Sequence, residues 1–212
     1  MYSIKHNVYD DQISPYWALG ATTVGIRVGD GVVLASEKRV SYGFTVTSKS
    51  AKKVFKITDY LGIACAGLIG DMQAIARSLK AEVKLYELDL NRKMPIKAAA
   101  KLLANILFSQ RYMPLISETL VGGVDETGPR LYVLDAIGSL IEDDYASLGS
   151  GSTIAIGVLE SNYKKDLTIE EARNLAVKAV RAAIERDALS GDGIDILMIT
   201  KDRAEETFET IK

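Results

Sequence analysis

The stretch Gly20-Ala21-Thr22-Thr23-Val24-Gly25-Ile26 marks the point at which the character of the chain changes. The residues up to Gly20 mix polar residues, aromatics and a proline without a sustained period. From Thr22 onwards apolar residues recur in strand-like and helix-like patterns. We therefore place a boundary near Gly20, with residues 1–20 as a leader and residues 21–212 as a single folded domain.

Two interpretations of this junction fit its residues. A self-cleaving hydrolase with an N-terminal nucleophile needs a small residue followed by hydroxylated ones. The small residue leaves the scissile carbonyl open to attack, and the hydroxyl then lies beside a newly formed α-amine. A flexible leader joined to a β-strand with a threonine-rich start gives the same pattern, because threonine is common in strands. On these residues alone the second, simpler interpretation is preferred.

Length, composition and charge set broad limits. A chain of 212 residues with 48% hydrophobic residues is long and apolar enough for a globular body with a proper core. A net charge of -2, with 26 basic and 28 acidic residues, offers no basic stripe for nucleic acid. No segment has the continuous apolar length of a membrane helix. We expect a cytoplasmic protein that binds neither nucleic acid nor membrane.

Two scarce residue types narrow the chemistry. The single cysteine, Cys65, lies in an apolar strand without a basic neighbour and is expected to pack rather than react. The single histidine, His6, lies in the leader. A core catalytic pair that uses histidine and a multi-histidine metal site are therefore not expected, and we predict no metal and no cofactor. A hydrolase built from this chain must use a lysine, a carboxylate or an α-amine as its base.

Hydrophobic periodicity predicts strands and helices in alternating groups. Strands are predicted at 22–28, 32–35, 54–57, 61–66, 119–124, 131–135, 139–145 and 194–200, a strand or extended segment at 41–48, and helices at about 70–91, 95–114, 153–163 and 168–187. The last helix begins with the capping box Thr168-Ile169-Glu170-Glu171, and residues 201–212 are expected to form a polar tail. This order favours an α+β fold in which stacked antiparallel sheets are covered by helices on both outer sides.

From Thr22 to about Thr200 the sequence resembles the β subunits of the archaeal proteasome. The resemblance rests on stretches that are specific in this order and spacing: 22–26 (TTVGI), 35–39 (ASEKR), 52–55 (KKVF), 66–71 (AGLIGD), 112–114 (YMP), 120–125 (LVGGVD), 145–152 (YASLGSGS), 157–160 (GVLE) and 186–191 (RDALSG). It implies a four-layer αββα sandwich of the N-terminal nucleophile hydrolase type. It further implies assembly with α subunits and other β subunits into stacked seven-membered rings, whose chamber degrades unfolded polypeptides.

The resemblance also assigns roles to particular residues. A threonine freed at its N-terminus attacks the peptide carbonyl, and its own α-amine, with an intrinsic pKa near 7.7 to 8.0, serves as the base. Lys53, balanced by Glu37, supplies positive charge beside the nucleophile. We expect the Lys53 side chain to point into the cavity beside residue 21, whereas Lys49 and Lys52 face elsewhere. Ser150, Asp187 and Ser190 orient the amine, and the Gly67 N–H receives the oxyanion.

Without the resemblance, Asp187 is better explained as a helix-end carboxylate and Glu37 as the partner of Arg39 in a surface ion pair. The resemblance also implies a pocket for the residue before the cleaved bond. Its expected substrate-binding residues are Val40, Ser41, Ala51, Phe55, Cys65, Ile69 and Gln73.

One position departs from the family pattern. Ala21 stands where the family has its catalytic threonine, four residues before Gly25 and directly after a glycine. Ala21 has no hydroxyl, so neither self-cleavage after Gly20 nor peptide hydrolysis is possible in this register. The chain is then an engineered variant, a naturally silent β subunit, or a subunit that uses Thr22 in a register shifted by one residue. The third explanation is disfavoured, because a shift of one residue along a strand reverses the side-chain direction.

Three functions remain open at this stage. The leading hypothesis is a proteasome β subunit of the threonine endopeptidase family that is silent as written. The main alternative is a non-catalytic structural subunit of the ring. A more distant alternative is another ring protease of the same fold.

Overall fold

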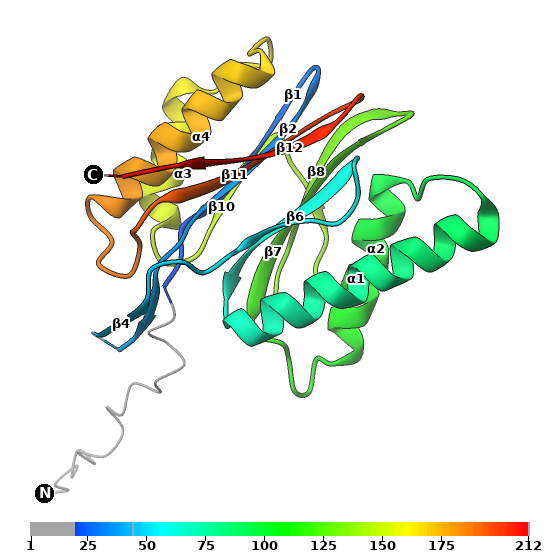
Figure 1. Cartoon of the computed structure of the whole chain (residues 1–212), viewed down its shortest axis with the longest axis horizontal. Helices are drawn as coiled ribbons and strands as arrows, with labels where there is room; N and C mark the ends of the chain where they lie inside the picture. The colour runs from blue at the N-terminus through cyan, green and yellow to red at the C-terminus, as the bar shows by residue number, and fades with distance from the viewer. Residues whose placement is uncertain (1–19, 44, 212) are drawn as a thin grey trace, which may run out of the picture.

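The structure is a computed structural model that describes residues 20–43 and 45–211. The predicted leader, residues 1–20, lies outside the described residues except for Gly20. Two five-stranded antiparallel sheets and a small hairpin make up the β structure of the described chain. Four helices cover the sheets, so the predicted αββα fold class is confirmed (Figure 1).

The first sheet collects strands from both ends of the described chain. Its spatial order is β10 (Tyr145–Leu148), β1 (Thr23–Val28), β2 (Gly31–Glu37), β11 (Ile194–Thr200) and β12 (Ala204–Glu209). Strands β1 and β2 form a hairpin whose two turn residues are Gly29 and Asp30, with Val28 opposite Gly31. The central strands therefore hold the start of the domain next to its last core strand.

The second sheet is built from the middle of the chain. Its order is β5 (Val54–Lys56), β6 (Leu61–Gly67), β7 (Ser117–Asp125), β8 (Gly128–Leu134) and β9 (Ile141–Glu142). A separate hairpin of β3 (Val40–Tyr42) and β4 (Thr45–Ser48) projects beside the start of β1 (Figure 1).

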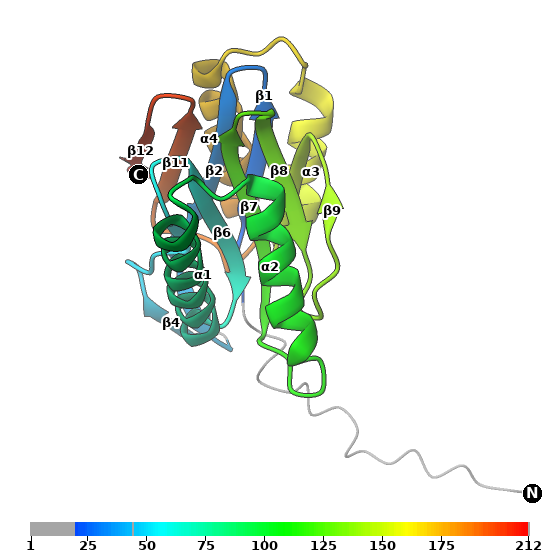
Figure 2. The same cartoon turned by 90° about the vertical axis from the view of Figure 1, so that its right-hand side faces the viewer.

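Helices cover the outer face of each sheet. The second sheet is covered by α1 (Ile69–Leu90) and α2 (Ile96–Ser109), and the first by α3 (Ser152–Asn162) and α4 (Ile169–Ile184) (Figures 1 and 2). The predicted capping box starts α4: the Thr168 hydroxyl accepts from the Glu171 N–H, and the Glu171 carboxylate accepts from the Thr168 N–H. Each helix buries one apolar face against its sheet.

Three hydrophobic clusters fill the spaces between the four layers. One lies between the second sheet and α1–α2, another between the first sheet and α3–α4, and the third between the two sheets. Two glycines allow the sheets to approach closely. A Cβ on Gly25 would lie 2.8 Å from Leu131 Cδ1, and a Cβ on Gly122 would lie 2.7 Å from Val32 Cγ1. The layers are therefore packed without room for larger residues at these points.

The structure corrects several predicted boundaries. The strand or extended segment expected at 41–48 is a hairpin, because the chain turns at Gly43 with φ +58°. The strand expected at 139–145 is two strands, β9 and β10, which belong to different sheets. The polar tail contains the edge strand β12. The helices predicted to run to Pro114 and Asp187 end earlier, at Ser109 and Ile184.

In the part of the chain that the structure describes, no helix is long and apolar enough to cross a membrane.

Candidate active site

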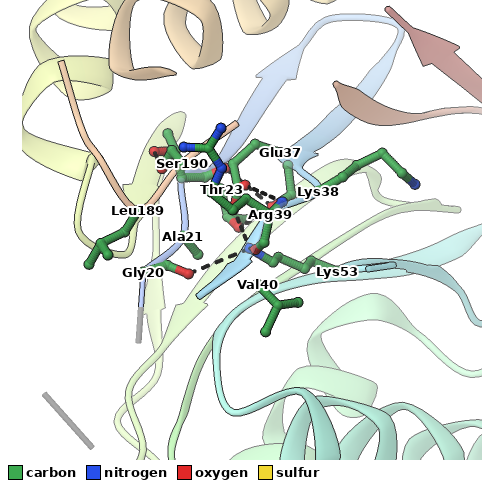
Figure 3. A network of polar contacts seen from close by, with 12 residues as sticks. Gly20, Ala21, Thr23, Glu37, Lys38, Arg39, Val40, Lys53, Leu189 and Ser190 are labelled. Carbon is green, nitrogen blue, oxygen red and sulfur yellow. Dashed lines mark hydrogen bonds and ion pairs between the residues drawn. The ribbon is translucent and has the colours of Figure 1, made fainter. Parts of the chain in front are cut away.

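Position 21 lies at the entrance to β1, where side chains alternate between the two faces of the first sheet. Ala21 is fully buried in the cluster between the sheets, and Thr23 faces the same way, because its hydroxyl donates to the Cys65 carbonyl at 2.9 Å. Thr22 faces the helix side, where its hydroxyl lies 2.7 Å from Ser190 Oγ. The short side chain of Ala21 therefore points toward the second sheet, from which Lys53 reaches in (Figure 3).

Lys53 and Glu37 form a fully buried ion pair next to this position. Lys53 is 1% exposed and precedes β5, while Glu37 is 0% exposed and ends β2. The Lys53 ammonium contacts a Glu37 carboxylate oxygen, donates to the Arg39 carbonyl at 2.7 Å and lies 3.5 Å from the Gly20 carbonyl oxygen (Figure 3). The amine of Lys53 is thus held against the peptide that joins residues 20 and 21.

Burial shifts the pKa of both Glu37 and Lys53. Burial raises the pKa of Glu37 above its ordinary value, although the neighbouring Lys53 opposes the shift. Burial lowers the pKa of Lys53, although Glu37 opposes that shift as well. Lys49 and Lys52, by contrast, face solvent. A lysine whose pKa is lowered by burial and that lies beside a reactive position is typical of a functional site.

A second network approaches position 21 from the loop after α4. The Asp187 carboxylate accepts from Ser150 Oγ at 2.5 Å and from Ser190 Oγ at 2.6 Å. Ser150 Oγ in turn accepts from the Ala21 N–H at 3.3 Å. Asp187 is therefore joined to the nitrogen of residue 21 through Ser150, while Ser190 contacts Asp187 and the Thr22 hydroxyl.

Arg39 links the two networks and had no role in the sequence-based site. Its guanidinium donates to Asp192 Oδ2 at 2.8 Å and to the Ala188 carbonyl at 3.0 Å, and its backbone N–H donates to Glu37 at 2.6 Å. The alternative explanation of Glu37, a surface ion pair with Arg39, is wrong, since Glu37 pairs with Lys53 and the Arg39 guanidinium pairs with Asp192. Asp192 lies 153 positions from Arg39, so no local pattern in the sequence reveals the pair.

Gly67 ends β6 in a conformation that only glycine adopts without strain. Its φ is +140°, and an added Cβ would lie 2.2 Å from the Ile116 carbonyl oxygen. The Gly67 backbone can therefore pass close to the backbone of Ile116 at this point. Gly67 lines a cavity of about 410 Å³ together with Gly20 and Lys53.

The predicted substrate-binding residues separate into two groups. Val40, Ser41 and Ile69 line this cavity, whose other walls include Tyr42, Thr47 and Leu68. The remaining predicted residues are not among the residues that line it: Cys65 is fully buried, Phe55 packs against the cluster under α1, Ala51 is half-buried and Gln73 is exposed on α1. Tyr42, Thr47 and Leu68 carry no sequence signal for this role.

A second, smaller cavity also has Gly67 in its lining. It measures about 220 Å³ and is lined by Gly67, Ile116, Glu118 and Gly149, among others. The Glu118 carboxylate accepts from the Gly149 N–H at 3.2 Å. Gly67 thus lines both cavities. Within the described residues, no cluster of histidine, cysteine and carboxylate side chains could hold a metal ion.

Comparison with known proteins agrees with this arrangement. Residues 18–199 match the family described as Proteasome subunit. Proteasome subunit beta 1 of Hyperthermus butylicus is 56% identical over 200 residues, which cover 92% of this chain and 98% of that protein. Proteasome subunit beta 2 of Thermofilum pendens is 57% identical over 183 residues, which cover 86% of this chain and 90% of that protein. The chain therefore belongs to the proteasome family and is a β subunit of the core particle.

Proposed function

We propose that this chain is a β subunit that builds the complete surroundings of a threonine-protease site but is catalytically silent as written. The observation that carries the proposal is Ala21. Its nitrogen is bound by Ser150, and the peptide before it is contacted by the Lys53 ammonium. The one group missing from this position is the hydroxyl that would attack a peptide bond.

A threonine at position 21 would supply that group. Cleavage of the bond after Gly20 would first free its α-amine. Its Oγ would then attack the carbonyl carbon of a substrate and pass its proton to that amine, which would protonate the leaving nitrogen. Water would hydrolyse the ester left on Oγ, releasing the acid and restoring the threonine. Lys53 would favour the developing negative charge on Oγ, and Ser150 with Asp187 would orient the amine. The Gly67 N–H is proposed as the donor to the oxyanion. No cofactor enters this chemistry.

The geometry around Thr22 favours this register over the shifted one. The Thr22 hydroxyl is fully buried and lies 2.7 Å from Ser190 Oγ, on the helix side of the sheet. A Cβ added to Gly151 would lie only 2.1 Å from Thr22 Oγ1, so little space remains around that hydroxyl. Thr22 is therefore poorly placed to reach either cavity.

The proposed partners follow from the family. The chain assembles with α and β subunits in the core particle, and we propose that it does so in stacked seven-membered rings that enclose unfolded polypeptides. Ala21 favours a structural contribution: the chain forms part of the chamber wall while active β subunits cut the substrate. A six-membered ring without α subunits would instead indicate the most distant alternative, another ring protease of the same fold.

The test is to restore the hydroxyl in core particles where this chain is the only β subunit. Ala21→Thr should give peptide hydrolysis and release residues 1–20, while the unmodified chain should give neither. Ala21→Val is the matched control, because valine has the shape of threonine without the hydroxyl. Peptide hydrolysis by the unmodified particle, or an assembled Ala21→Thr particle that remains inactive, would contradict the proposal.

A further inference from the structure

The four-layer body has two lateral edges at which the sheets end. Strands β5 and β12 form one edge, flanked by α1, and strands β9 and β10 form the other. Figure 2 shows β12 and β9 on opposite sides of the molecule. Side chains tie the two sheets together at each edge: Lys52 Nζ lies 2.6 Å from Glu206, and Arg27 Nη1 lies 3.1 Å from Glu142.

The first edge carries an excess of positive charge. A cavity of about 640 Å³ there is lined by three carboxylates and by five lysines, which we call the basic edge: Lys52, Lys56, Lys80, Lys84 and Lys93. The carboxylates, Asp59, Glu87 and Glu206, each lie within ion-pair distance of one of these lysines. Five lysines against three carboxylates leave a net charge of +2. Within the described residues Lys80 and Lys93 form no ion pair, and both are exposed.

The opposite edge carries an excess of negative charge. Four carboxylates form what we call the acidic edge: Glu142, Asp143, Asp144 and Glu160. Arg27 pairs with Glu142 and Asp144, and Arg130 pairs with Glu142 at 2.7 Å. Four carboxylates against two arginines leave a net charge of -2. Asp143 is exposed and forms no ion pair in the described part of the chain.

Each edge also exposes a large apolar side chain beside its charges. Ile141 on β9 is 57% exposed, and Phe208 on β12 is 53% exposed. Edge strands present unpaired backbone groups that folded proteins normally cover or protect. The two edges therefore combine opposite charge, an exposed apolar residue and uncovered backbone, which are features that a protein partner would cover.

We infer that the basic edge of one copy of this chain docks against the acidic edge of the next copy. The inference rests on the proposed ring assembly and names the surfaces that build it. Because the two surfaces differ, the contact is head-to-tail, and such contacts close into rings when the rotation between copies fits. Complementary charge fixes which edges meet and in which direction, and Ile141 and Phe208 supply apolar contact area.

The test reverses the charge of each edge in core particles assembled from the full chain and α subunits. Lys80→Glu with Lys93→Glu changes the basic edge from +2 to -2, so it should repel the acidic edge of the neighbour. Asp143→Lys with Glu160→Lys changes the acidic edge from -2 to +2. Each double variant should reduce the fraction of chain in assembled particles roughly tenfold at low salt. The variant with all four changes should recover assembly, because the two edges then attract again with exchanged signs.

The control and the readout separate this inference from the proposed function. Lys164→Glu with Lys165→Glu changes the charge by the same amount in the exposed loop between α3 and α4, and it should assemble normally. Particle mass is measured rather than hydrolysis, so an inactive Ala21→Thr particle would not affect the result. Normal assembly of both edge variants at low salt would overturn the inference. Failure of the folded four-change variant to assemble would also overturn it, since the neighbour would not then be a copy of this chain.

Discussion

The buried pair of Lys53 and Glu37 makes a sharp stability prediction. Lys53→Met keeps the stem of the side chain and removes its charge, which leaves the fully buried Glu37 without its counter-ion. Breaking a buried pair in this way costs about 3–5 kcal/mol of unfolding free energy. Glu37 still accepts from the N–H groups of Arg39 at 2.6 Å and Gly191 at 3.0 Å. We therefore expect a loss near the lower limit, about 3 kcal/mol.

The double variant provides the control for this estimate. Lys53→Met with Glu37→Gln removes both charges and keeps an amide oxygen that can accept from Arg39 and Gly191. Replacement of a whole buried pair by neutral groups is often close to neutral. The double variant should therefore be about 2 kcal/mol more stable than Lys53→Met alone. Guanidinium unfolding of the full chain, followed by circular dichroism, measures both differences. Equal stability of the single and double variants would refute the reasoning.

The same single variant should respond to pH in a defined direction. Burial raises the pKa of Glu37 above its ordinary value of 4.5, and removal of Lys53 takes away an influence that lowers it. A carboxyl whose pKa is higher in the folded state binds its proton more tightly there, so folding is favoured as pH falls. The stability gap between Lys53→Met and the parent should narrow as pH falls from 7 toward 4.5. A gap that stays constant or widens would contradict this account.

Three further predictions follow from other parts of the site. The intact mass of the assembled chain should include residues 1–20, since Ala21 cannot cleave the bond before it; a chain that begins at Thr22 would establish the shifted register. Cys65, whose pKa burial raises to about 12, should resist iodoacetamide at pH 8 in the folded chain and react after unfolding; rapid labelling of the folded chain would contradict its burial. The Ala21→Thr particle should cleave fluorogenic peptides after leucine or phenylalanine and poorly after arginine. The described lining of the 410 Å³ cavity contains Val40, Leu68 and Ile69 but no carboxylate, so preferred cleavage after arginine would show that the pocket is wrongly assigned.

The sequence predicted the elements best where a local signal exists. The helix that starts at Thr168 carries its own capping box, and its apolar residues repeat at the helical period. The short strands were harder to predict from the sequence. In 139–145 the chain leaves one sheet and enters the other within a few residues, and a pattern of alternating side chains does not show which sheet a strand joins. Strand β12 was missed because an edge strand with exposed glutamates has the composition of a tail.

The site shows the same division between local and distant information. Lys53 could be suspected from its place directly before the apolar Val54, whereas the part played by Arg39 depends on Asp192, on a distant loop. The resemblance to proteasome β subunits supplied Glu37, Ser150, Asp187 and Ser190 together, and the structure brings these side chains around residue 21. The walls formed by Tyr42, Thr47 and Leu68 come from the β3–β4 hairpin and from the residue before α1, and no local pattern shows that these segments line one cavity.

The contacts around position 21 have a physical role in the fold that does not depend on catalytic activity. Lys53 and Glu37 are fully buried, so the loss of either one would leave the other as an unpaired charge in the core. Glu37 also accepts from the Gly191 N–H, which ties the end of β2 to the loop that carries Asp187. The same bonds that would orient a catalytic threonine therefore hold the first sheet, the second sheet and the loop after α4 together. In the silent subunit that we propose, alanine in place of threonine at position 21 removes a hydroxyl but no buried charge. The surrounding network would therefore still be needed for folding.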